Sequence, residues 1–112
     1  SYMLSCSSDH SIKLWKLTNS KLKLLGTCEK AHEKHVRMVD WKSNYFNEEE
    51  KTFVSCSEDH SVKIWSLKIF EDKCTFILKG STVMKGPVYK AKYNFIGNLL
   101  AVSYCNEDEQ KV

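Results

Sequence analysis

Two cysteine–histidine pairs are the side chains of this sequence whose types and spacing come closest to a chemical site. Cys6 and His10 have a C-x-x-x-H spacing, and Cys56 and His60 repeat it. Such a pair could supply two ligands to a metal ion, but a structural zinc site needs four ligands in a tetrahedron. We therefore expect the cysteines to be small apolar packing residues and the histidines to lie in turns. No metal ion and no other cofactor is expected.

Catalytic patterns are also missing from the sequence. His32 has the chemistry of a general base, but no serine or cysteine nucleophile stands at a recognisable motif spacing from a base, and no glycine-rich phosphate loop is present. The net charge of +3 comes without a concentrated basic stripe, which argues against direct nucleic-acid binding. The five cysteines include no C-x-x-C pair, which favours free thiols in a reducing compartment. We expect a non-enzymatic chain without a small-molecule substrate.

An internal repeat is the strongest signal in the sequence. Residues 1–17 and 51–67 match at a shift of 50, and nine of the 17 positions are identical. The identical residues of the first copy are Ser5, Cys6, Ser7, Asp9, His10, Ser11, Lys13, Trp15 and Leu17. A weaker copy at 99–112 aligns at a shift of 48, which places Val102 and Ser103 on Val54 and Ser55. The V-x-x-V-x-W pattern at 36–41 also has a counterpart at 88–93, where Val88, Ala91 and Tyr93 take the three positions.

Each repeat unit has the pattern of short β-strands. Alternation of side chains and bounding Asp, Asn and Ser residues predict strands in the middle unit at 36–41, 53–57, 61–67 and 73–79. In the third of these, Val62 and Ile64 lie on one face and Trp65 and Leu67 on the other, so the sheet must be covered on both sides. Four antiparallel strands per unit of about 50 residues, stacked face to face, describe a β-propeller blade.

The predicted fold class is therefore all-β, an incomplete β-propeller of about two and a half blades. We expect a partial blade at 1–30, a complete blade at 31–80 and a partial last blade at 81–112. A closed propeller takes about four to eight blades. The chain is thus expected to be a piece of a longer polypeptide, or to need other chains that cover its faces.

The S-x-D-H-S segments resemble the WD-repeat family. That family has a structural tetrad that holds the blade together and does no chemistry: a His before the first strand, a Ser or Thr on the second, an Asp in the next turn and a Trp on the third strand. In the middle unit the resemblance places this tetrad on His32, Ser55, Asp59 and Trp65. The first unit retains Ser5, Asp9 and Trp15, whereas in the last unit Glu107 stands at the Asp position.

The order and spacing of these units are similar to the last three blades of the six-bladed WD-repeat propellers of the COPII vesicle coat and the nuclear-pore scaffold. The similar stretches are 12–16, 31–57 with a long loop at 42–52, and G-N-x-L-A-V-S at 97–103. Tyr89 and Tyr93 stand where those propellers usually have Trp. The resemblance implies an open propeller that is completed by a blade donated in trans, by a cage-forming coat subunit or by a scaffold nucleoporin.

This resemblance implies a role in ER-to-Golgi protein transport, at the cytosolic face of the ER and of COPII vesicles, or at the nuclear pore, with contact to membranes that is peripheral at most. The donated blade would lie beside the strands of the last blade, whose candidate contact residues are Val88, Tyr89, Leu100 and Val102. Arg37 and Lys90, at equivalent positions of two first strands, are further candidates near one mouth of the propeller.

Three alternatives stay open: the nuclear-pore paralogue of that propeller, the cytosolic iron–sulfur protein assembly propeller, and a WD-repeat adaptor that binds peptides at its mouth. Charge gathered around Arg37 and Lys90 would favour the adaptor, and an apolar, uncovered blade face would favour donation. The acidic runs at 48–50 and 107–109 are expected to be solubilising loop tips.

Overall fold

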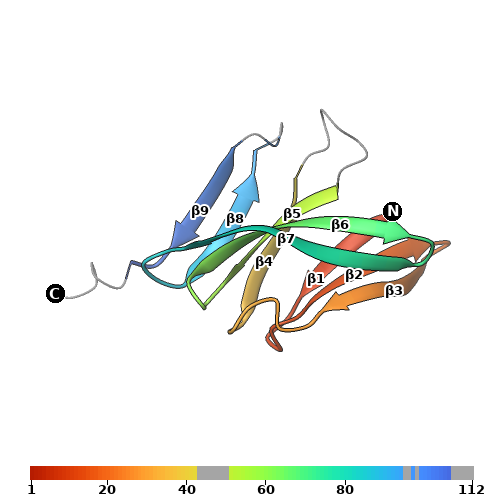
Figure 1. The fold of residues 1–112 in the computed structure, drawn as a ribbon, viewed down its shortest axis with the longest axis horizontal. Helices are drawn as coiled ribbons and strands as arrows, with labels where there is room; N and C mark the ends of the chain where they lie inside the picture. Colours follow the sequence, from red (N-terminus) through yellow and green to blue (C-terminus); the bar gives the residue numbers. More distant parts are fainter. Residues whose placement is uncertain (43–50, 95–96, 98, 107–112) are drawn as a thin grey trace.

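Three antiparallel sheets make up the described part of the chain (Figure 1). The computed structural model describes residues 1–42, 51–94, 97 and 99–106. The first sheet has the order β1 (Tyr2–Cys6), β2 (Ile12–Thr18), β3 (Lys21–Cys28). The second has the order β4 (Val36–Trp41), β5 (Lys51–Ser57), β6 (Ser61–Phe70), β7 (Lys73–Val83), and the third pairs β8 (Val88–Tyr93) with β9 (Leu100–Tyr104).

The all-β prediction is confirmed, and Figure 1 shows the three sheets side by side in chain order. Every neighbouring pair of strands within a sheet is antiparallel and consecutive in sequence. This order is that of a propeller blade, in which each strand leads directly to its neighbour. Within the described residues, the search for a helix with the length and apolarity to cross a membrane found none.

The S-x-D-H-S segments form the turns that lead to β2 and β6. In the second sheet, Asp59 Oδ1 accepts a hydrogen bond from Ser61 N at 2.9 Å, and Ser57 Oγ accepts one from Asp59 N at 3.1 Å. His60 closes the turn with a φ of 74°, and its repeat equivalent His10 has a φ of 76°. Histidine is among the residues enriched in this left-handed region, so both histidines are turn residues.

Three strands extend beyond their predicted ranges. β5 begins at Lys51 rather than at residue 53, and Lys42 N donates a 2.8 Å hydrogen bond to Thr52 O, so the expected loop at 42–52 is shorter. β6 runs to Phe70, which pairs with Lys73 at the turn of the hairpin, and β7 runs to Val83, which pairs with Ser61 at the other end. Backbone pairing needs no apolar side chain, which is why the hydrophobic pattern underestimates these strands.

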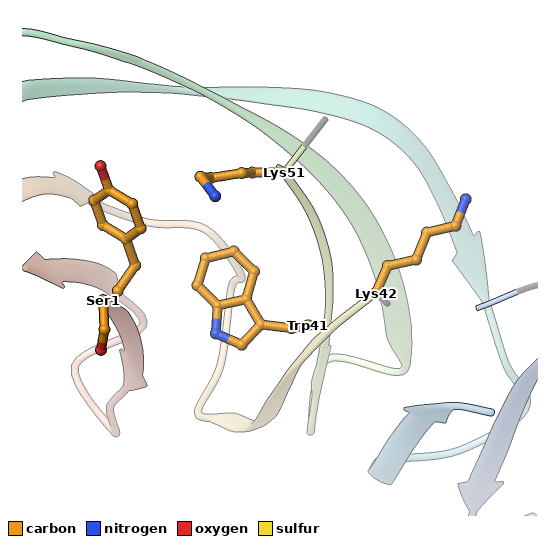
Figure 2. A pocket seen from close by; sticks show the side chains of 5 residues that line it. Ser1, Trp41, Lys42 and Lys51 are labelled. Atoms are coloured by element: carbon orange, nitrogen blue, oxygen red, sulfur yellow. The ribbon is translucent and has the colours of Figure 1, made fainter. Parts of the chain in front are cut away.

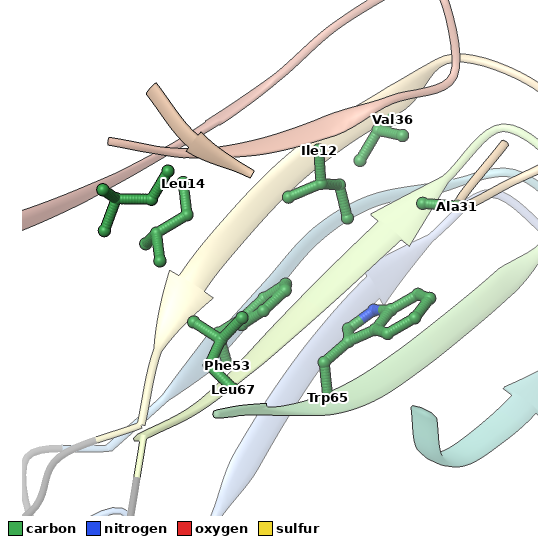
Figure 3. Packing of buried hydrophobic residues seen from close by; sticks show 8 residues of the cluster. Ile12, Leu14, Ala31, Val36, Phe53, Trp65 and Leu67 are labelled. Carbon is green, nitrogen blue, oxygen red and sulfur yellow. The ribbon is translucent and has the colours of Figure 1, made fainter. Parts of the chain in front are cut away.

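Two apolar layers hold the sheets together. Between the first and second sheets, Phe53 and Trp65 stack with their ring centroids 6.2 Å apart, facing Ile12 and Leu14 (Figure 3). Between the second and third sheets lies a separate cluster of buried residues, namely Val54, Cys56, Val62, Val88 and Ala91. The second sheet is thus covered on both faces, as the two-sided pattern of Val62 and Trp65 predicts.

The register of the third sheet differs from the expected alignment by one residue. Ser55 pairs with Val39 in the second sheet, but Val102, not Ser103, pairs with the equivalent Ala91. The prediction that Ser103 takes the place of Ser55 is therefore wrong. A shift of one residue turns every side chain to the other face, and the observed register directs Val102 into the apolar layer against the second sheet.

Candidate functional site

A buried hydrogen-bond network joins the four side chains of the expected tetrad in the second sheet. His32 lies in the segment before β4, Ser55 on β5, Asp59 in the following turn and Trp65 on β6. His32 Nε2 lies 2.7 Å from Ser55 Oγ, and Trp65 Nε1 donates to the same oxygen at 2.8 Å. On the other side of the ring, His32 Nδ1 lies 3.0 Å from Asp59 Oδ2 and 2.9 Å from Ser61 Oγ.

The donors and acceptors of this network fix its protonation. Because Ser55 Oγ accepts the indole N–H of Trp65, its own hydroxyl hydrogen is free to donate to His32 Nε2. The ring proton then lies on Nδ1 and points at Asp59 and Ser61, while Ser61 Oγ donates to Asp59 Oδ1 at 2.6 Å. Each donor then meets an acceptor, so the hydrogen-bond network assigns to His32 the tautomer with its proton on Nδ1. No buried polar side-chain atom of the described residues lacks a hydrogen-bond partner.

The pKa values of the histidine and the aspartate follow from this arrangement. Burial lowers the pKa of His32 and outweighs the opposing effect of Asp59, so the imidazole is neutral at physiological pH. Burial by itself would raise the pKa of Asp59, but hydrogen bonds from Ser61 and the Glu33 N–H, together with His32, lower it to about 2. The pair is therefore a neutral imidazole beside a carboxylate, not an ion pair.

The Ser55–His32–Asp59 series has the connectivity of a hydrolase triad, yet it cannot act as one. In such a triad the serine oxygen must reach a substrate carbonyl. Ser55 is 0% exposed and His32 1% exposed, and the Ser55 oxygen is already bound to the indole of Trp65. The network is thus structural: it ties the segment before β4 to the turn and to the middle of the sheet.

The first sheet contains part of the same network. Trp15 Nε1 donates to Ser5 Oγ at 2.9 Å, and Asp9 Oδ1 accepts from both Ser11 N and Ser11 Oγ. No described histidine takes the place that His32 has in the second sheet. A hollow of ≈ 340 Å³ beside this turn is lined by Asp9, Ser11, Lys13, Thr27, Glu29 and Lys30.

The cysteine–histidine pairs form no metal site among the described residues, where no group of three or more potential ligands was found. Cys56 is buried in the layer against the third sheet. Burial and the nearby Cys6 raise the pKa of its thiol to about 11. A thiol of such high pKa is a poor ligand and a poor nucleophile, which agrees with a packing role.

Comparison with known families gives the identity of this fold. The sequence profile of the family described as WD domain, G-beta repeat, matches residues 1–16 and 22–66, more than half of the chain. The chain belongs to the WD-repeat family. No individual curated protein matches the chain significantly. WD-repeat proteins are in general non-enzymatic scaffolds or adaptors that bind other proteins, and the buried network of this chain fits that description.

The candidate partner residues of this WD-repeat chain differ in their environments. Arg37 forms an ion pair with Glu58 and lies 5.8 Å from the ring centroid of Tyr89 on the next sheet. Tyr89 is 45% exposed and Lys90 is also exposed. Val88, in contrast, is 0% exposed, so its side chain cannot contact a partner protein. Leu100 and Val102 are half-buried beside the cluster between the second and third sheets. The structure thus brings together Arg37 with Tyr89, and Val88 with Leu100 and Val102, but not all the candidates at one place.

Several contacts between blades could not be found from the sequence. Tyr93 N donates to Asp40 Oδ2 at 3.0 Å and so joins the third sheet to the second. Lys23 on β3 and Asp72, in the turn between β6 and β7, form an exposed ion pair at 2.7 Å between the first and second sheets. Each contact joins residues about 50 positions apart, and only their repeat positions could have suggested it.

A hollow of ≈ 290 Å³ lies where the start of the first sheet meets the second, lined by Ser1, Tyr2, Trp41, Lys42 and Lys51 (Figure 2). Lys51 Nζ lies 5.0 Å from the ring centroid of Tyr2, a distance suited to a cation–π contact. Figure 2 shows the Trp41 indole beside Lys51, with Ser1 on one side of it and Lys42 on the other. The aromatic rings are therefore part of the packing between the two blades, and the lysines lie at its edge.

Proposed function

We propose that this WD-repeat chain belongs to a non-catalytic assembly subunit similar to the Sec-thirteen propeller of the COPII coat and the nuclear-pore scaffold. A partner protein would donate a blade beside the last blade of this chain. The single observation that supports this most is the G-N-x-L-A-V-S stretch at 97–103, which is similar to the final blade of those propellers. A blade donated by another chain would add strands by β-augmentation.

The distribution of charge and apolar surface favours donation over peptide binding at the mouth. The charge of Arg37 is compensated by Glu58, which also has His35 Nδ1 3.7 Å from its carboxylate. The apolar surface beside Val62 and Leu100, by contrast, lines an open groove. Binding of an acidic peptide would need a cationic side chain that is not already in an ion pair, whereas β-augmentation needs an open strand edge and an apolar sheet face.

The proposal places the protein at the cytosolic face of ER-derived vesicles or at the nuclear envelope. The nuclear-pore paralogue, the iron–sulfur assembly propeller and a peptide adaptor are the competing assignments. Affinity purification of the tagged full-length protein, followed by mass spectrometry, distinguishes them by the proteins recovered. Recovery of a cage-forming coat subunit or a scaffold nucleoporin would support the proposal, and recovery of iron–sulfur assembly proteins alone would refute it.

A matched pair of surface variants tests the position of the contact. Tyr104 is 37% exposed at the end of β9, and Phe70 is 77% exposed at the end of β6 in the second sheet. Tyr104→Asp should abolish recovery of the partner, because it places a charge at the edge where donated strands would pack. Phe70→Asp introduces the same charge far from that edge and should leave recovery unchanged. Equal recovery with both variants would show that β9 is not the contact.

A further inference from the structure

A hollow of ≈ 780 Å³, here called the lysine hollow, lies where the β2–β3 hairpin meets the turn of the β6–β7 hairpin. Figure 1 shows both hairpins ending at the same side of the molecule. The charged residues that line the hollow are Lys16, Lys21, Lys23 and Asp72, and two leucines of β3 also line it. Both hairpins lie within the described residues, and neither end of the chain lines the hollow.

The lysine side chains share the face of the first sheet that is turned toward the second sheet. Lys16 follows two residues after Leu14, which is buried in the apolar cluster between these sheets. Side chains two residues apart in a strand lie on the same face. Lys16 pairs with Lys23, and two residues further along β2, Thr18 pairs with Lys21. The four residues therefore form a block of three lysines and one threonine on one face of the hairpin.

This concentration of positive charge is unfavourable for the isolated hairpin. Lys16 and Lys23 stand directly opposite each other, and like charges in such a cross-strand pair are destabilising. The repeat does not require the block, because the equivalent pairs of the second sheet contain one lysine and no pair of like charges. These pairs are Ser66 with Ile77, and Lys68 with Thr75.

Asp72 neutralises only part of the charge in the lysine hollow. Its carboxylate accepts a 2.7 Å hydrogen bond from Lys23 Nζ. Lys23, and with a smaller effect Lys16, lower the pKa of this carboxyl group. Lys16 and Lys21 form no ion pair within the described part of the chain. Three ammonium groups thus face one carboxylate, and two positive charges have no counter-charge of their own.

We propose that the lysine hollow binds an extended acidic segment of a partner protein, whose carboxylates at positions i and i+2 contact Lys16 and Lys21. In an extended segment, side chains two residues apart project to the same side at a spacing of about 7 Å. Successive side chains on one face of β2 and β3 have the same spacing. Thr18, in the same row as Lys21, supplies an uncharged hydroxyl donor beside it.

The charge and the shape of the hollow favour a peptide over a membrane. Sites for anionic lipids typically have clusters of about four to eight basic residues, whereas three lysines line this hollow. A concave site between two hairpins can be entered by an extended chain but not by a planar bilayer. Unlike Arg37, which forms an ion pair with Glu58, Lys16 and Lys21 are available to an acidic segment. The inference does not depend on the donation of a blade.

The experiment measures binding of a labelled peptide to the full-length protein by fluorescence anisotropy. The probe is an alternating Asp-Ser peptide of about eight residues, and the reference is the same peptide with Asn in place of Asp. The ionic strength is about 0.15 M, where charges more than about 8 Å away are largely screened. The Asp peptide should bind and the Asn peptide should not.

A matched pair of double variants locates the contact. Lys16→Gln with Lys21→Gln should weaken binding about tenfold, since each exposed ion pair contributes a factor of about two to five. Lys34→Gln with Lys79→Gln removes the same charge at exposed positions outside the hollow and should leave the affinity unchanged. The urea midpoint of the first variant should not fall, because it relieves the repulsion between lysines, so lost binding would not come from unfolding.

Asp72→Asn gives an effect of opposite sign. It removes the carboxylate that competes for the lysines, so the Asp peptide should bind about two- to fivefold more tightly. A purely structural role of the ion pair between Lys23 and Asp72 would not increase the affinity.

Several results would overturn the inference. Equal binding of the Asp and Asn peptides, equal losses in the two double variants, or an unchanged affinity of Asp72→Asn would each do so. Attachment to vesicles with about one-third phosphatidylserine, lost in the Lys16 and Lys21 variant and without binding of the peptide, would assign the hollow to a membrane surface. Tighter binding of the peptide after replacement of the glutamates at 48–50 by Gln would assign the hollow to an acidic run of the chain itself.

Discussion

Removal of the Asp59 carboxylate is the sharpest test of the buried network. Asp59 accepts hydrogen bonds from Ser61 N, Ser61 Oγ, Glu33 N and His32 Nδ1, at distances of 2.6–3.0 Å. The side chain of His32 is 0% exposed and that of Asp59 is 9% exposed, so water does not readily replace the lost acceptor. Asp59→Ala should therefore lower the free energy of unfolding by about 1–3 kcal/mol, the cost of buried donors left without a partner.

The expected loss is smaller than the sum over four hydrogen bonds. His32 Nδ1 keeps Ser61 Oγ as an acceptor at 2.9 Å after the substitution, and Glu33 is exposed, so its N–H can bind water. The donors with no replacement are the N–H and the hydroxyl of Ser61, at the start of β6. The main effect should thus be a less ordered turn at the start of that strand.

The first sheet supplies a matched control for this substitution. Asp9 makes the same two bonds to Ser11, but its carboxylate is exposed and no described histidine joins it. Asp9→Ala should therefore cost less than Asp59→Ala in urea unfolding followed by tryptophan fluorescence. Equal losses for the two variants, or an unchanged midpoint for Asp59→Ala, would show that the histidine-linked network adds nothing to stability.

Four further outcomes follow from the same structure. Folding lowers the pKa of His32 below 6.5 and that of Asp59 from 3.8 to about 2. The unfolded chain then binds more protons, so urea midpoints should fall as the pH drops below 6.5, and fall again between pH 3.8 and 2. Trp65→Phe should cost about 1 kcal/mol through loss of the indole hydrogen bond, measured by urea unfolding followed by circular dichroism. Phe53→Ala should cost about 3–5 kcal/mol in the same assay, because Phe53 is 0% exposed between two sheets. Asp40→Ala should speed hydrogen exchange at Tyr93 N, its partner on β8, without a comparable effect in the first sheet.

The strands of the second sheet could be predicted because local chemistry and tertiary packing agree there. β4 has the predicted bounds of residues 36–41, and the two-sided apolar pattern of β6 matches the two clusters that cover its faces. The resemblance to the WD-repeat family also placed Asp59 and Trp65 in one proposed site, and in the structure both are part of the hydrogen-bond network. Where periodicity, turn residues and the repeat indicate the same element, the sequence is a sufficient guide.

The third sheet could not be predicted in the same way. In the segment Leu100-Ala101-Val102-Ser103, apolar residues occupy both phases of the alternation, so the pattern allows two registers one residue apart. The shared serine favours one of them, and the apolar cluster against the second sheet selects the other. Contacts such as Arg37 with Glu58 could not be predicted for a different reason. They depend on how a strand and a turn that are distant in the sequence meet in space.

The buried hydrogen-bond network and the apolar clusters have separate tasks in the second blade. The hydrogen-bond network of the second sheet joins the turn at Asp59 to strands of the same sheet, whereas Phe53 and Val54, adjacent on β5, pack on opposite neighbours. The network therefore stabilises a blade from within, and each face is stabilised only by the next blade. In such an array stability is approximately a sum of blade terms and nearest-neighbour interface terms. The first sheet keeps part of its network, through Trp15 with Ser5 and Asp9 with Ser11, while the apolar cluster around Phe53 supplies its interface with the second sheet.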